Sequence, residues 1–90
     1  MLETQAPSDA ELALLLQAVQ DGDDRNALVD NEMLAKALDW PLTLVAGCLE
    51  EAKVRSMIWG MRSGQRPAPW YTDLEVTVQG KRFLSEHSPA

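Results

Sequence analysis

The stretch DNEMLAKALDWPLTLVAGCLEEAKVRS, residues 30–56, is the most informative for the fold because it predicts two helices separated by a tight turn. Asp30 is a residue type that caps helix N-termini, and the apolar residues after it recur at helical spacing. Asp39 tolerates the left-handed conformation that ends a helix, and Pro41 is favoured in the first turn of the next one. We therefore expect a helix that ends near Asp39 and a second one that starts at Pro41 or the next residue and ends near Ser56.

Both helices are predicted to be amphipathic, since their apolar residues recur with the period that places them on one side. The other side of the second helix is charged. The inner faces are predicted to carry Leu34, Ala35 and Leu38 in the first helix and Leu42, Val45, Leu49 and Ala52 in the second, and the outer face Glu50, Glu51, Lys53 and Arg55.

A further helix is predicted on the N-terminal side. Ser8 and Glu11 form an S-x-x-E pattern, in which each side chain bonds a free backbone N–H of the first helical turn. The helix is expected to end at residues 21–24, because glycine and aspartate favour turns. Residues 27–29 are an apolar run that predicts a short strand, and residues 1–7 a disordered leader. The inner face of this helix is expected to carry Leu12, Leu15, Leu16 and Val19.

The C-terminal part changes from a helical to a strand-like period. Residues 57–59 and 70–78 are predicted strands, joined by a glycine- and proline-rich loop over 60–69. Residues 79–87 predict a short last helix, and 88–90 a frayed tail. The chain is therefore expected to form one α+β domain over residues 8–87, with a three-helix core and a sheet of two or three antiparallel strands.

Composition and charge limit the function classes. The net charge is −6, and residues 1–45 carry nine acidic side chains against two basic ones, whereas the remainder carries five against six. A polyanion would have to approach the C-terminal half. No apolar run has the length of a membrane span and no signal peptide is evident, so a cytoplasmic location without membrane association is expected. The single cysteine, Cys48, excludes an internal disulfide.

No enzyme motif is evident. The sequence has no glycine-rich phosphate loop, no nucleophile elbow and no histidine or cysteine pair at metal-ligand spacing, so we expect no catalysis, no cofactor, no metal and no small-molecule ligand. The acidic cluster at 21–24 is interpreted as a solvated helix end. Among the tryptophans, Trp40 is expected to fill the turn between helices, and Trp59 and Trp70 to pair across the two strands and close the core.

Three fragments between Glu11 and Leu84 together resemble the winged helix-turn-helix superfamily. Residues 34–40, LAKALDW, are similar to its L-A-x-x-L-G-hydrophobic helix and turn, with aspartate in place of the glycine. Residues 45–58 place a valine, a leucine and the start of a strand where the superfamily does, with serine for the customary glycine. Residues 76–84, VTVQGKRFL, are similar to the L-T-x-x-G-(K/R)-x-x-L ending of several bacterial transcription-regulator branches.

The resemblance implies double-stranded DNA as a partner, with the third helix in the major groove and the loop between the strands, the wing, against the backbone or minor groove. Regulators of this kind usually form dimers, so a homodimer is also implied. The predicted nucleic-acid-binding residues are Thr43 in the third helix, Lys53 and Arg55 at its end, and Arg62, Gln65 and Arg66 in the wing.

The alternative is a domain that binds protein. The third helix offers almost no Arg, Lys, Asn or Gln on its expected outer side, where base readout relies on those residues. Gly47 within that helix is costly, which predicts a close neighbour there. The predicted protein-binding surface comprises Leu42, Leu44, Ala46 and Gly47.

Overall fold

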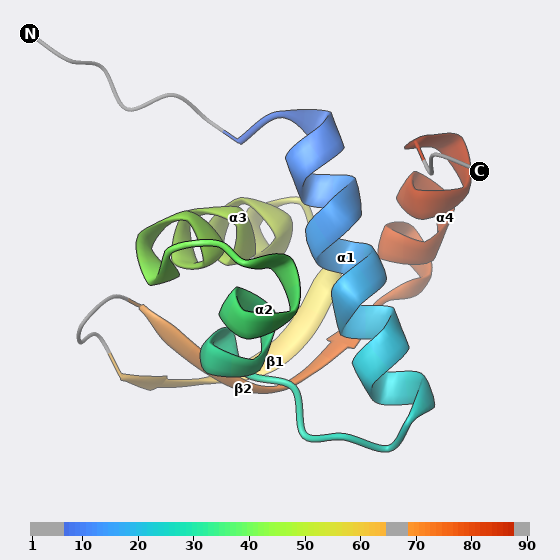
Figure 1. The fold of residues 1–90 in the computed structure, drawn as a ribbon. Helices are drawn as coiled ribbons and strands as arrows, with labels where there is room; N and C mark the ends of the chain where they lie inside the picture. Colours follow the sequence, from blue (N-terminus) through green and yellow to red (C-terminus); the bar gives the residue numbers. More distant parts are fainter. Residues whose placement is uncertain (1–6, 65–68, 88–90) are drawn as a thin grey trace, which may run out of the picture.

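The computed structural model describes residues 7–64 and 69–87, and within them helices α1, α2 and α3 lie on one side of a β-hairpin while α4 lies beside α1 (Figure 1). The described residues therefore confirm the α+β class, with four helices and one two-stranded antiparallel sheet. The elements are α1 (Asp9–Asp24), α2 (Asn31–Leu38), α3 (Leu42–Val54), β1 (Ile58–Gly64), β2 (Trp70–Val76) and α4 (Val78–His87).

Helix α1 begins at the predicted cap and ends within the predicted range, but its glycine has a different role from the expected one. The Ser8 hydroxyl accepts from the Glu11 N–H at 3.1 Å and the Glu11 carboxylate accepts from the Ser8 N–H at 3.0 Å, which completes the capping box. The helix ends at Asp24, within the expected range of residues 21–24, but Gly22 does not end it as predicted, because this residue lies inside the last turns of the helix. Gly22 is buried, and a Cβ there would lie 2.7 Å from the side chains of Val29 and Met33. This glycine permits close packing, and Asn26 adopts the left-handed turn instead, at φ 58°.

The α2–turn–α3 unit agrees with prediction. The Asp30 carboxylate caps α2 by accepting from the Met33 N–H at 2.9 Å. Asp39 adopts the left-handed conformation, at φ 56° and ψ 46°, and its N–H bonds the Ala35 carbonyl. Trp40 follows, half-buried against the core, where it fills the turn as predicted.

The hairpin is longer and less regular than predicted. β1 extends to Gly64, so the expectation of a loop from residue 60 is wrong over its first half. The register pairs Ile58 with Val76 and Trp59 with Glu75, and then shifts twice towards the wing. The first shift adds a residue in β2 at Asp73, whose φ is 54°. Since Trp70 lies opposite Gly64, the predicted pairing of Trp59 with Trp70 is also wrong.

The segment before α2 does not form the predicted strand. Residues 27–30 are irregular, and the sheet in the described part of the chain has two strands rather than three. One backbone hydrogen bond joins this segment to the sheet, from the Leu74 N–H to the Val29 carbonyl at 3.2 Å. The apolar run at residues 27–29 thus places Val29 in the core and does not add a strand to the sheet.

The V-T-V-Q-G segment links the sheet to α4 through two side-chain hydrogen bonds and one close contact. The Thr77 hydroxyl accepts from the Gly80 N–H at 3.0 Å and donates to the Ser56 carbonyl at 2.7 Å. A Cβ on Gly80 would collide with the carbonyl oxygen of Met57. α4 therefore begins at Val78, one residue before the predicted start, and the expected continuation of the second strand through 78 is wrong.

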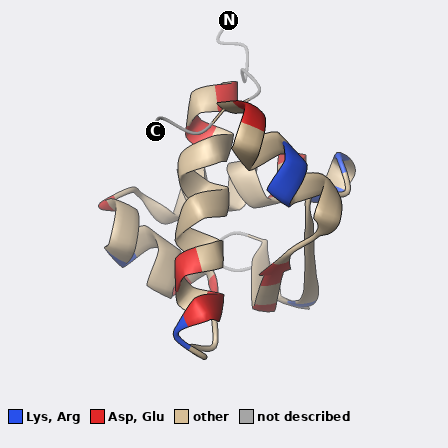
Figure 2. Cartoon of the chain, turned by 90° about the vertical axis from the view of Figure 1, so that its right-hand side faces the viewer, with Lys and Arg blue, Asp and Glu red and all other residues tan. Residues whose placement is uncertain are grey.

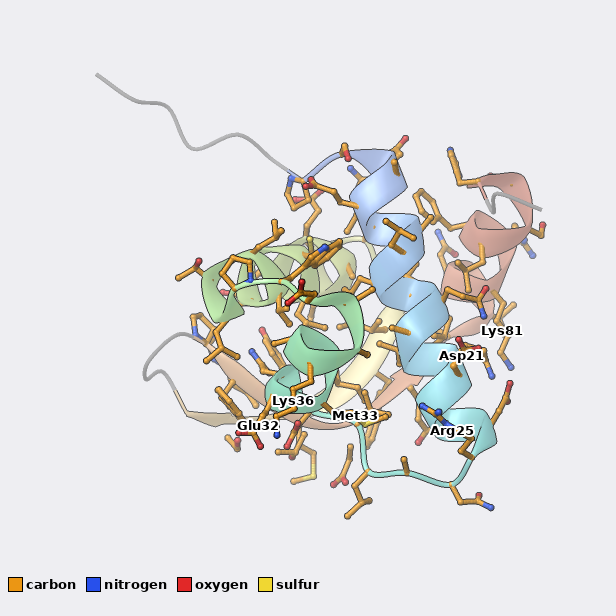
Figure 3. All side chains as sticks on the ribbon, in the orientation of Figure 1. Asp21, Arg25, Glu32, Met33, Lys36 and Lys81 are labelled. Carbon is orange, nitrogen blue, oxygen red and sulfur yellow. The ribbon has the colours of Figure 1, made fainter. Side chains whose placement is uncertain are left out.

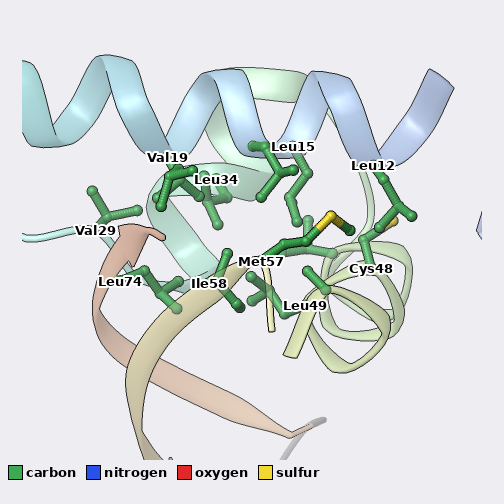
Figure 4. Close-up of a cluster of buried hydrophobic side chains, with 14 of the residues drawn as sticks. Leu12, Leu15, Val19, Val29, Leu34, Cys48, Leu49, Met57, Ile58 and Leu74 are labelled. Carbon is green, nitrogen blue, oxygen red and sulfur yellow. The ribbon is translucent and has the colours of Figure 1, made fainter. Parts of the chain in front are cut away.

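The core lies between α1 and the hairpin and is almost entirely aliphatic (Figure 4). Helix α1 contributes leucines to this cluster and contacts α3 and β2, and the cluster has members in all the elements. Among the described helices, none combines the length and the apolar character that crossing a membrane requires. The buried residues drawn and labelled in Figure 4 are Leu12, Leu15, Val19, Val29, Leu34, Cys48, Leu49, Met57, Ile58 and Leu74.

Candidate interaction surfaces

The outward face of α3 differs from the predicted one. Ala46 is buried, with 3% of its surface exposed, and Leu44 packs against the core, because the helix is rotated so that both point inward. Gly47 is exposed, and no atom lies within 4 Å of the position of an added Cβ. The predicted close neighbour of Gly47 is therefore wrong, and the predicted apolar surface is reduced to the half-buried Leu42 and the bare backbone of Gly47.

The same face is poorly equipped to recognise bases. Thr43 is exposed as predicted, but Gly47 and Val54, which are also exposed along α3, have no side chain that can bond a base edge. Lys53, in the last turn, is the one exposed side chain of the helix that can pair with two atoms of a base. Glu50 is half-buried beside them, and its carboxylate would repel a phosphate.

A contact between α3 and the hairpin orders the side chains at the root of the wing. The Tyr71 hydroxyl donates to Glu50 Oε2 at 2.5 Å, and the Arg62 guanidinium lies 6.0 Å from the centre of the Tyr71 ring. Burial, followed by the hydrogen bond to Glu50, raises the pKa of Tyr71 to about 12. The Tyr71 side chain thus has one predicted nucleic-acid-binding residue over its ring and bonds a carboxylate of α3 with its hydroxyl.

The remaining predicted cations are separated by the fold. Lys53 is exposed, and its ammonium lies 3.5 Å from the Gly60 carbonyl of β1. Arg55 turns away from the wing and bonds Asp9 at 3.3 Å and Glu51 at 2.8 Å, so it joins α3 to the start of α1. The hydrogen bond to Glu51 is the main cause that raises the pKa of Arg55. Gln65 and Arg66 lie outside the described residues.

Asn31 is a buried polar residue that the sequence pattern does not single out. Its amide donates to the Pro69 carbonyl at 2.9 Å and accepts from the Tyr71 N–H at 2.8 Å, which fixes the start of β2 against α2. An asparagine in the first turn of a helix is ordinary in sequence. Only the fold reveals its partners, which lie about 40 residues away in the chain.

Two large apolar side chains project from the side of the hairpin that faces away from α1, α2 and α3. Trp59 is 55% exposed and Met61 56% exposed, and two residues apart on one strand they share a side. Their strand partners Glu75 and Thr72 have side chains on that same side. We call these four residues the outer face. Neighbouring residues of a strand point to opposite sides, so a buried Ile58 implies an exposed Trp59. The expected pairing of Trp59 with Trp70 hid this implication.

A hollow of about 210 Å³ lies beside the outer face, between β2 and the segment that precedes α2. Leu28, which is 81% exposed, and the carboxylate residues Asp23, Asp73 and Glu75 line it. The charges of the described residues are unevenly placed (Figure 2): acidic residues gather at the two ends of α1, and the basic ones are dispersed. Glu75 belongs to both the hollow and the outer face, so the two form one surface.

A second groove, of about 380 Å³, lies between α1 and α2. Leu14, Ala18 and Leu38 contribute its apolar lining, and Asp21 and Arg25 its α1 rim (Figure 3). One acid and one base on that rim give it no preference for the sign of a ligand's charge.

Cys48 is buried beneath α1, and burial, with a smaller contribution from the charge of Glu11, raises the pKa of its thiol to about 11. A thiol that keeps its proton at neutral pH is a poor nucleophile, as expected of a residue that fills space. No group of three metal-binding side chains occurs in the described ranges.

Comparisons with protein-family models, with curated proteins and with solved structures find no match to this chain, so its function is inferred from the chemistry of these surfaces.

Proposed function

We propose that this chain is a winged-helix domain that binds a protein partner through the outer face of its hairpin. The winged-helix assignment is supported by the order of the elements, in which α2, a tight turn and α3 precede an antiparallel hairpin. The exposure of Trp59 and Met61, side by side on β1, is the observation that carries the protein-binding function.

Exposed tryptophan and methionine are unfavourable in water unless a partner covers them. Removing apolar surface from water contributes about 25 cal/mol per Å², and a tryptophan has one of the largest such surfaces of any side chain. Tryptophan is also enriched among the few residues that supply most of the energy of protein interfaces. Neither residue supports the core in this fold, because both point away from it.

Nucleic-acid binding is the second candidate, favoured by the exposure of Lys53 and Arg62 on the α3 side of the hairpin. These cations can contact phosphates without reading bases. The net charge of −6 and the absence of amide or guanidinium side chains from the exposed face of α3 weaken it.

The protein-binding proposal is tested by replacing Trp59 with a photoreactive aromatic residue in the cells that make this protein. Irradiation is expected to yield a discrete covalent adduct to protein, identified by mass spectrometry. The same replacement at Leu14, an exposed leucine on α1, is the matched control and should give no such adduct. An absence of protein adducts from position 59 would overturn the proposal.

The second candidate is tested by fluorescence anisotropy with random-sequence duplex DNA at low and moderate salt. If it holds, affinity falls as salt rises. Replacing Lys53 and Arg62 with alanine should then make the slope of log affinity against log salt shallower by roughly 0.9 for each phosphate that the variant no longer neutralises. Lack of binding at low salt excludes it.

A further inference from the structure

We infer that the partner segment that covers the outer face is a cationic, apolar stretch of polypeptide, in which Lys or Arg side chains accompany apolar ones. The inference rests on the proposed protein-binding function and specifies the chemistry of the partner. It is carried by the arrangement of carboxylates around exposed apolar side chains.

The register of the hairpin supplies the first step. Trp59 is directly opposite Glu75, so an apolar surface and a carboxylate lie next to one another on the same side of the sheet. A side chain that packs on the indole therefore passes within reach of the carboxylate. A lysine or arginine satisfies both, because its aliphatic stem packs on the ring while its charged end extends to the acid.

The hollow supplies the second step. Asp23 and Asp73 lie with Glu75 in its lining, next to the exposed Leu28. None of these three carboxylates forms a salt bridge with another described residue. Three unneutralised negative charges that converge on apolar surface attract a cation and disfavour an anionic ligand.

The same charges argue against other occupants. Two copies of this chain that met through their outer faces would bring both sets of carboxylates together, a like-charge arrangement that opposes association. Nucleic acid is excluded from this side for the same reason. The α1–α2 groove offers no comparable selection, since Asp21 and Arg25 oppose one another in charge on its rim.

The test uses two fluorescently labelled peptides, one of alternating lysine and leucine and one of alternating glutamate and leucine. Anisotropy at low and moderate salt should show binding of the lysine peptide alone, weakening as salt rises. In the isotope-labelled full chain, the lysine peptide should shift the backbone amide resonances of Trp59, Met61, Asp73 and Glu75.

Variants locate the contact. Trp59→Ser should weaken the affinity for the lysine peptide about tenfold, as expected for a central aromatic anchor. Glu75→Gln should weaken it roughly two- to fivefold. Glu86→Gln, which removes an exposed carboxylate from α4, is the matched control and should have no effect. All three positions are exposed, and an amide spectrum that keeps its dispersion verifies the fold of each variant.

The results that would contradict the cationic partner are distinct from those that would contradict the protein-binding function. Equal binding of both peptides, no binding of the lysine peptide, or amide shifts confined to other surfaces would overturn the cationic partner. Photo-adducts from position 59 to a protein would still uphold the proposed function in those cases. If those adducts are to a second copy of the chain, the protein-binding function stands and the cationic partner is wrong.

Discussion

The α2–turn–α3 unit and the hairpin are held in place by different means. The unit relies on local signals, such as the Asp30 cap and the left-handed Asp39, each of which acts within a few residues. The hairpin relies on partners far along the chain, including Asn31 and the Val29 carbonyl. The difference implies that single substitutions should weaken the protein more when they affect the hairpin's inner contacts than when they alter the turn.

The largest expected effect comes from the inward side of the hairpin. Leu74→Ala removes a fully packed side chain and should lower the free energy of unfolding by about 2–5 kcal/mol, measured by urea denaturation. Met61→Ala on the outer face is its control and should change that value by less than about 0.5 kcal/mol. If both variants lower the free energy of unfolding by similar amounts, the assignment of Leu74 to the buried side of the hairpin and Met61 to the exposed side is wrong.

Asn31→Ala should have the next largest effect. It leaves the buried Tyr71 N–H and the Pro69 carbonyl without their partner, and we expect a loss of about 2–3 kcal/mol in the free energy of unfolding. Amide hydrogen exchange should locate the loss at the start of β2. If protection there is unchanged, Asn31 does not hold the hairpin.

Alkaline pH should lower the free energy of unfolding, because two buried side chains keep their protons only in the folded state. The folded state keeps the protons of Cys48 and Tyr71, with pKa values raised to about 11 and about 12, while the unfolded chain loses them near pH 9 and 10. The unfolded state thus binds fewer protons in this range, and stability falls as pH rises from about 9 towards 12. Denaturation at a series of pH values measures the fall. Tyr71→Phe should make the fall smaller above pH 10 and leave only the contribution of Cys48, which ends near pH 11. A fall that is identical in this variant would exclude the tyrosine.

The smallest effect is expected in the turn. Asp39→Gly relieves the left-handed conformation at φ 56° but adds freedom to the unfolded chain, and the two nearly offset. A gain of a few tenths of a kcal/mol, up to about 1, should appear as a slightly higher melting temperature. A loss above about 1 kcal/mol would show that the aspartate side chain makes a contact of its own.

The candidate site was less predictable than the fold. Thr43, Lys53 and Arg62 are exposed as nucleic-acid contacts require, whereas Arg55 is engaged by Asp9 of another helix. The rotation of α3 that buries Ala46 is set by how the helix packs in the fold, which helical spacing alone does not determine. The expectation that Trp59 closes the core is wrong, because the register pairs it with Glu75 instead of Trp70 and leaves its side chain exposed.

The helices and their turn can be predicted from the sequence alone. Helix capping, the spacing of apolar residues and the ability of a residue to adopt the left-handed conformation all depend on neighbouring residues. Asp30, Asp39 and the Ser8–Glu11 pair needed no distant partner. The extent of the hairpin, and which side of it faces solvent, emerge only when the chain is folded. They depend on Asn31, on the two register shifts and on the close approach of Gly80 to Met57, contacts between residues that are remote in the chain and carry no local pattern.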